Sequence, residues 1–117
     1  GVRVLRAMPN TAAMVGRSAT ALAAGDTATR ADIELATQIF RSVGTVVQVA
    51  EGQMDAITGL SGSGPAYLYL IVEAMTDGAV AMGLPRATAR ELAIETLAGS
   101  AEMLSSTSEH PAVLREM

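Results

Sequence analysis

The stretch "TGLSGSGPAYLYLI", residues 58–71, places three glycines and two serines directly before a long apolar run. Ser63, Gly64 and Pro65 are typical of a helix start, because a small polar residue caps the first turn and proline fits the first helical position. A flexible spacer needs no such start. We therefore expect an ordered turn over residues 61–64, where helix N-terminal amides are suited to a polar or anionic group.

The segment after this turn, residues 65–82, predicts a helix with apolar side chains on all sides. A helix that is apolar all round is buried all round, and a chain of 117 residues has too few other helices to cover it. We expect a second copy of the same chain to supply the cover. Glu73 and Asp77 argue against a membrane span, and we expect them to pair with arginines across that interface.

Before residue 51 the pattern is that of an α/β sheet, and after it the chain is all helical. Short apolar runs predict strands at 2–7, 18–24 and 45–50, and a Thr29–Asp32 capping box begins a helix that Gly44 ends. Further helices are predicted in the remaining segments, at 51–60, at 87–104 and from Pro111 onward. Because the sheet is short of strands and the last helix is barely begun, we expect a piece of a longer protein.

Composition excludes several classes of function. The net charge is −4 and the eight cationic side chains are all arginines, which are scattered along the chain, so no nucleic-acid surface is expected. Without cysteine there is no disulfide or thiolate metal site, and no metal site is predicted. No signal peptide is recognisable, and we expect a cytoplasmic protein. The single histidine, His110, precedes Pro111 and is expected to begin a helix rather than to donate a proton in catalysis.

Four short motifs occur in a characteristic order: "MPNT" (8–11), "TGLSGSGPAY" (58–67), "MGLPR" (82–86) and "EHP" (109–111). In order and spacing they resemble the pyrroline-5-carboxylate reductase family. The resemblance implies reduction of the C=N bond of 1-pyrroline-5-carboxylate to L-proline with NADPH or NADH. It also implies that residues 1–51 are the end of a Rossmann-type domain. Residues 52–117 would then be part of a helical domain that binds substrate and forms a homodimer, with a higher oligomer left open.

The same resemblance implies the site residues. It places Thr58 beside the ring nitrogen of the substrate and Met8, Pro9 and Asn10 at the nicotinamide end of the cofactor. The further substrate-binding residues that it implies are Ser61, Gly62, Ser63 and Gly64. No catalytic residue is assigned, because the pyrroline nitrogen can take its proton from water. Where the family often has proline, this chain has Ala12.

Each of these segments also has a purely structural interpretation. The residues themselves allow 8–11 to be a turn that ends a strand, Thr58 to bond back to its own helix, and 61–64 to be a packing corner. In a functional turn, a Cβ at Gly62 or Gly64 would clash with a ligand or disfavour a positive φ.

The chain contains no dinucleotide fingerprint. "GLSGSG" (59–64) has the glycine order G-x-x-G-x-G, the reverse of G-x-G-x-x-G, and it follows a helix rather than a strand. We therefore expect these 117 residues alone neither to bind NADPH usefully nor to catalyse, and NADPH cannot be told from NADH. Two other functions stay open: an autonomous dimerisation module without activity, and a related imine or β-hydroxyacid reductase.

Overall fold

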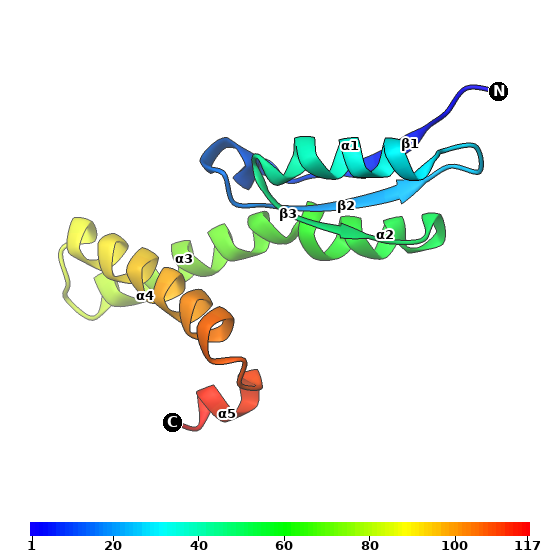
Figure 1. Cartoon of the computed structure of the whole chain (residues 1–117). Helices are drawn as coiled ribbons and strands as arrows, with labels where there is room; N and C mark the ends of the chain where they lie inside the picture. Colours follow the sequence, from blue (N-terminus) through cyan, green and yellow to red (C-terminus); the bar gives the residue numbers. More distant parts are fainter. The chain divides into compact units, whose positions relative to one another are not determined.

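The computed structural model describes all 117 residues, which form two compact units, Gly1–Tyr67 and Leu68–Met117 (Figure 1). The first unit contains a three-stranded sheet and the second contains only helices. The chain is thus mostly helical with a small sheet near its beginning, as the sequence predicts. The expected domain boundary at residues 51 and 52 stays a prediction.

The sheet has the order β1 (Leu5–Met8), β2 (Ser18–Ala24), β3 (Gly44–Gln48). β1 runs antiparallel to β2 and β3 runs parallel to it. All three predicted strands are present, although β1 begins three residues later than expected and β3 ends two residues earlier. A 3-10 helix, η1 (Thr11–Val15), which the sequence did not predict, follows β1 and is capped by Asn10.

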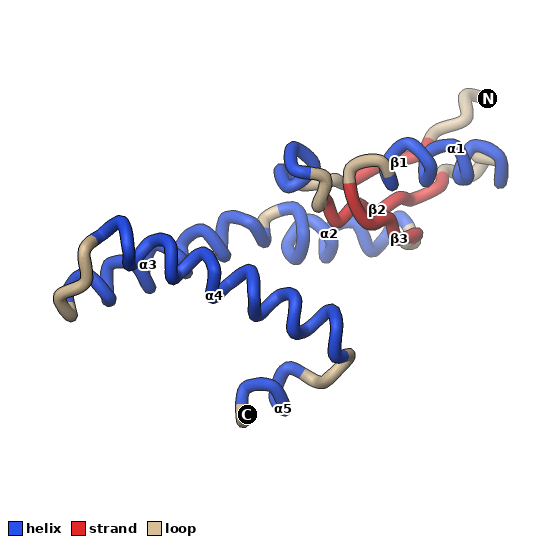
Figure 2. The backbone as a smooth tube through the Cα atoms, turned by 60° about the vertical axis from the view of Figure 1, so that its left-hand side comes forward, coloured by secondary structure: helices blue, strands red, loops and turns tan.

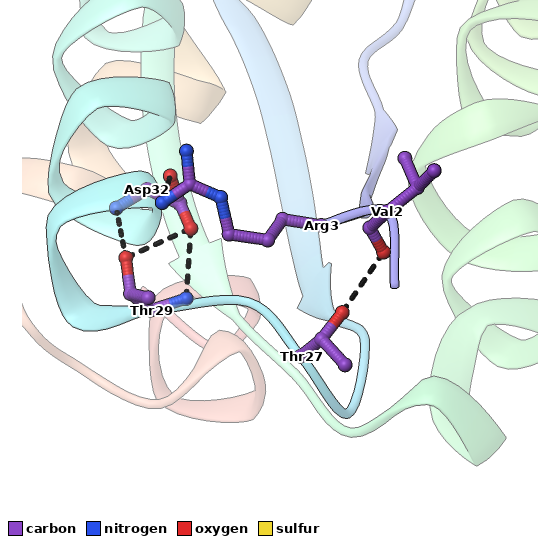
Figure 3. Close-up of polar contacts among 5 residues, drawn as sticks. All are labelled: Val2, Arg3, Thr27, Thr29 and Asp32. Carbon is purple, nitrogen blue, oxygen red and sulfur yellow. Dashed lines mark hydrogen bonds and ion pairs between the residues drawn. The ribbon is translucent and has the colours of Figure 1, made fainter.

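Helix α1 (Arg30–Arg41) begins with the predicted capping box, in which the Thr29 side chain and the Asp32 backbone and side chain bond reciprocally. Figure 3 shows the contacts of the N-terminal segment with the start of α1 and the turn before it. The Arg3 guanidinium lies 3.4 Å from the Asp32 carboxylate, and the Thr27 hydroxyl donates to the Val2 carbonyl at 2.9 Å. The Thr29 backbone N–H, its hydroxyl and the Arg3 guanidinium, in that order, lower the pKa of Asp32 below 3.8.

The core of this first unit is built from small side chains on β2. α1 lies on one face of the sheet, and α2 (Met54–Ile57) lies on the other (Figure 1). Met54 packs against Ala21 and Ala23, and Met8, Val49 and Ile57 surround that cluster. The predicted helix over 51–60 is in fact three successive pieces, namely the 3-10 helix η2 (Glu51–Gln53), α2, and the π-helix η3 (Thr58–Gly62).

The second unit begins inside α3 (Gly64–Ala81), which is followed by α4 (Arg86–Thr107) and α5 (Pro111–Arg115). Figure 2 shows α3 and α4 side by side near the loop that joins them and diverging farther from it. Only Thr76, Ala89 and Ala93 of these helices are buried. α3 carries six large apolar side chains that are 41 to 64% exposed, namely Tyr67, Leu68, Tyr69, Leu70, Ile71 and Met75. None of the helices, α3 included, has the length and hydropathy that crossing a bilayer requires.

Candidate functional site

The glycine-rich stretch of the sequence forms a π-helix rather than an open turn. The Ser63 backbone N–H donates to the Thr58 carbonyl at 2.7 Å, which is the i→i+5 bond that defines this geometry. Gly59 and Gly62 add no side chains to this wide turn. The ordered turn that the sequence predicted is therefore present, but it is helical over most of its length, and the Ser63 amide is already committed within it.

The two hydroxyls of this π-helix bond back to the preceding turn. Thr58 Oγ1 donates to the Met54 carbonyl at 3.0 Å, and Ser61 Oγ donates to the Ile57 carbonyl at 3.3 Å. The structural interpretation of Thr58 is thus confirmed, yet it does not exclude a ligand, because the donated proton leaves the oxygen lone pairs available. Thr58 is exposed, so a group with an N–H could approach that oxygen.

The glycines of this stretch do not have positive φ angles. Positive φ angles occur at Gly16, Gly44 and Gly83, and neither Gly62 nor Gly64 has one. Of the two reasons given for glycine at these positions, a positive φ is therefore excluded, because a π-helix and the α-helix after it use ordinary helical angles, and a close approach by a ligand stays a prediction. A Cβ at Gly62 would meet Thr58 Cγ2 at 3.7 Å and Met8 Sδ at 3.8 Å, which are normal contacts, and a Cβ at Gly64 would meet nothing.

The loop after β1 reaches the π-helix through Asn10. Its Nδ2 donates to the Ser61 carbonyl at 3.1 Å, although 51 residues separate the two positions, and its Oδ1 accepts from the Ala12 N–H at 3.1 Å. Asn10 therefore caps η1 with one end of its amide and holds the π-helix with the other. Met8 lies beside Gly62.

These contacts bring together the residues that the resemblance named for two different ligands. Met8 and Asn10 were expected at the cofactor, Ser61 and Gly62 at the substrate, and the structure places the two pairs in contact. Pro9 is exposed between Met8 and Asn10. Ser63 and Gly64 are half-buried, and they continue the π-helix into the first turn of α3. No long-range pairing of this kind can be read from local sequence patterns.

Sequence reasoning missed two residues beneath this site, Ser18 and Thr20. Both lie on β2, both are buried, and their hydroxyls are 3.1 Å apart. Ser18 Oγ also accepts the backbone N–H of Asn10 at 3.2 Å. Two hydroxyls at alternate positions of an otherwise alanine-rich strand were the available signal, because buried hydroxyls need partners.

In the second unit a groove of about 560 Å³ lies between α3 and α4. Tyr69, Val72 and Glu73 line it from α3, and Arg90 and Ile94 line it from α4. At its rim the Arg86 guanidinium donates to Asp77 at 2.8 Å. Asp77 therefore has an arginine partner within its own chain, and pairing of Glu73 and Asp77 across an interface stays a prediction.

His110 begins α5, as the sequence predicted. Its Nδ1 accepts the backbone N–H of Ala112 at 3.1 Å, and Pro111 occupies the first helical turn. The ring therefore acts as an N-cap in place of the usual serine or asparagine.

The comparisons with known proteins agree on one family. Residues 51–117 match the family model described as pyrroline-5-carboxylate reductase dimerisation. Curated relatives named pyrroline-5-carboxylate reductase include one from Methanosarcina acetivorans, 50% identical over all of this chain and 43% of its own length. Another, from Synechocystis, is 50% identical over 97% of this chain and 42% of its own length. This chain therefore spans less than half the length of these relatives.

Solved structures give the same result. A pyrroline-5-carboxylate reductase from Coxiella burnetii is 43% identical and superposes with a TM-score of 0.92 over 97% of this chain and 43% of its own. A pyrroline carboxylate reductase from Plasmodium falciparum, solved with NADP bound, is 32% identical and also has a TM-score of 0.92, over 97% of this chain and 46% of its own.

Proposed function

This chain belongs to the pyrroline-5-carboxylate reductase dimerisation family, and on that basis we propose that it is part of an enzyme that reduces 1-pyrroline-5-carboxylate to L-proline. The observation that carries the proposal is the bond from Asn10 to the Ser61 carbonyl, because it joins the segment proposed for the cofactor to the segment proposed for the substrate. Residues 1–51 are assigned to a Rossmann-type domain and residues 52–117 to the helical domain.

The cofactor end of the site consists of Met8, Pro9 and Asn10. Met8 is the last residue of β1, and Pro9 and Asn10 follow it directly. When bound, NADPH or NADH supplies the hydride that the reduction consumes. Pro9 is exposed and so is accessible to a nicotinamide, while Asn10 holds the loop against the π-helix.

The substrate end consists of Thr58, Ser61, Gly62, Ser63 and Gly64. Since the Thr58 proton is donated to Met54, the Thr58 oxygen acts toward a ligand as an acceptor. A protonated pyrroline nitrogen carries the N–H that such an acceptor binds. Holding this nitrogen fixes the adjacent imine carbon, and the acceleration comes chiefly from that positioning. The proton on nitrogen comes from water.

The partner of the helical domain is a second copy of this chain. Six large apolar side chains of α3 are exposed, and apolar patches of this kind mark surfaces where proteins associate. The family description, which names dimerisation, supports the same conclusion. Whether dimers assemble further is left to the measurement described in the Discussion.

The experiment is a kinetic assay of the complete protein that contains this chain, with 1-pyrroline-5-carboxylate and either nucleotide. Thr58→Val keeps the side-chain shape and removes the acceptor, so kcat/KM should fall about tenfold to a hundredfold, from a loss of about 1.4 to 2.8 kcal/mol. Thr58→Ser keeps the hydroxyl and is the matched control. Wild-type kcat/KM in Thr58→Val would remove Thr58 from the site.

Gly62→Ala tests the turn separately from the fold. Its new methyl group makes only ordinary contacts in the folded chain, so the melting temperature should stay near that of the wild type. If a ligand approaches this backbone closely, turnover should nevertheless fall. Gly52→Ala, at a position with open space around it, is the control. Equal turnover in both variants would mean that the turn is only a packing corner.

A further inference from the structure

Two buried hydroxyls lie under the proposed site without a packing reason for being polar. Ser18 is 2% exposed and Thr20 is 1% exposed, on a strand whose other buried side chains are alanines and a leucine. Alanine and valine would fill the same space, and replacing a hydrogen-bonded pair with apolar groups of the same shape can cost little stability. The hydroxyls therefore need an explanation in terms of what they hold.

What Ser18 holds is the backbone of Asn10. Ser18 Oγ accepts the Asn10 N–H at 3.2 Å and shares a second bond with Thr20 Oγ1 at 3.1 Å. From Asn10 the connection continues through Nδ2 to the Ser61 carbonyl at 3.1 Å. A single series of hydrogen bonds thus runs from the interior of β2 through the loop after β1 to the π-helix.

Ser18 is itself held by the start of β3 and by the residue before it. Its backbone N–H donates to the Val43 carbonyl at 2.9 Å, and it pairs with Gly44 in the parallel register. Gly44 has a φ of +151°, and a Cβ there would overlap the Ser18 backbone, so β3 approaches this point as closely as glycine allows. Because the Ser18 backbone is held in this way, its hydroxyl can fix the position of the loop that contains Asn10.

We infer that Ser18 is a positioning residue that sets the distance between the Met8–Asn10 loop and the Thr58–Gly62 π-helix. The inference rests on the proposed function, in which these two segments hold the two reactants. Ser18 touches neither reactant. Its loss leaves the groups that bind each reactant in place but loosens their mutual alignment, so the rate of the chemical step should fall more than either affinity.

The test compares Ser18→Ala with Thr20→Val in the complete protein. Ser18→Ala removes the acceptor of the Asn10 N–H, and kcat should fall about tenfold while both KM values stay within about twofold. Thr20→Val removes the other hydroxyl of the same buried pair but leaves the bond from Asn10 to Ser18. It should lower the melting temperature while kcat stays within about twofold of the wild type.

Hydrogen–deuterium exchange of the protein without ligands provides a readout that does not depend on turnover. Exchange over residues 58–64 should be faster in Ser18→Ala and unchanged in Thr20→Val. If Ser18→Ala does not fold, Ser18→Cys, which keeps the size and weakens the acceptor, takes its place. Unchanged kcat and exchange in the Ser18 variant, or equal effects of both substitutions, would overturn the inference. If the wild-type protein does not reduce 1-pyrroline-5-carboxylate, the proposed function fails, and the exchange result alone decides the role of Ser18.

Discussion

Leu70 offers a direct test of the association surface on α3. Its side chain is 64% exposed in the single chain. Burying a whole leucine side chain contributes about 1.5 to 3 kcal/mol, so burying the exposed part contributes about 1 to 2 kcal/mol. A two-fold dimer buries the same residue twice, which makes the contribution about 2 to 4 kcal/mol. Leu70→Ala should therefore raise the dimer Kd about 30-fold to 700-fold.

The assay is a dilution series of the complete protein followed by analytical ultracentrifugation. Leu35→Ala is the matched control, because Leu35 is also a leucine on a helix and is 59% exposed, but it lies on α1. Its Kd should stay within about threefold of the wild type, a difference of less than 1 kcal/mol. The reasoning would be refuted by a Leu70→Ala protein whose dimer Kd equals that of the wild type. A wild-type protein that is monomeric at every concentration tested would also refute it.

Three further substitutions test the fold. Gly44→Ala combines a positive φ with overlap of the Ser18 backbone, so it should lower the melting temperature strongly. Gly52→Ala, at a position in open space, should leave the melting temperature unchanged. Calorimetry measures the melting temperatures of both variants. Asp32→Asn should lower stability more at pH 7 than at pH 2. The folded pKa of Asp32 is lowered, so its contribution is present above pH 3.8 and is lost as the pH falls through the folded pKa; urea titrations at both pH values measure this. His110→Asn keeps an acceptor for the first turn of α5, so it should preserve turnover and the hydrogen-exchange protection of residues 111–115. His110→Ala should lose that protection. A loss of turnover in His110→Asn would contradict the capping role.

The elements of the fold could be predicted because their signals are local. A capping box marks the start of α1, prolines mark the starts of α4 and α5, and short apolar runs between turns mark the strands. The end of α1 was predicted less well, because the helix stops at Arg41 with Ser42 as its C-cap, and Gly44 begins β3 instead. These features depend on residues within one or two turns of each other, which is the range that a sequence pattern covers.

The site could be predicted only as a set of residues, because its contacts are long-range or depend on unusual geometry. The bond from Asn10 to Ser61 joins positions 51 residues apart. The pair of Asp77 and Arg86 closes across a loop. The π-helix at Thr58–Gly62 has no propensity signal of its own, and the glycines that suggested a positive φ adopt helical angles instead. The 3-10 helix η1 and its Asn10 cap were not predicted either, although asparagine is a preferred N-cap.

The small core has a calorimetric consequence. The buried apolar side chains are four alanines, Leu22 and Met54, so folding one copy removes little apolar surface from water. The heat capacity of unfolding grows with the apolar surface exposed, and globular proteins average about 12 to 15 cal/mol/K per residue. A single copy of this chain should therefore fall below that average, and separation of the two copies of the proposed dimer should add to the heat-capacity change. Because association stabilises folded chains by mass action, the melting temperature should rise with protein concentration.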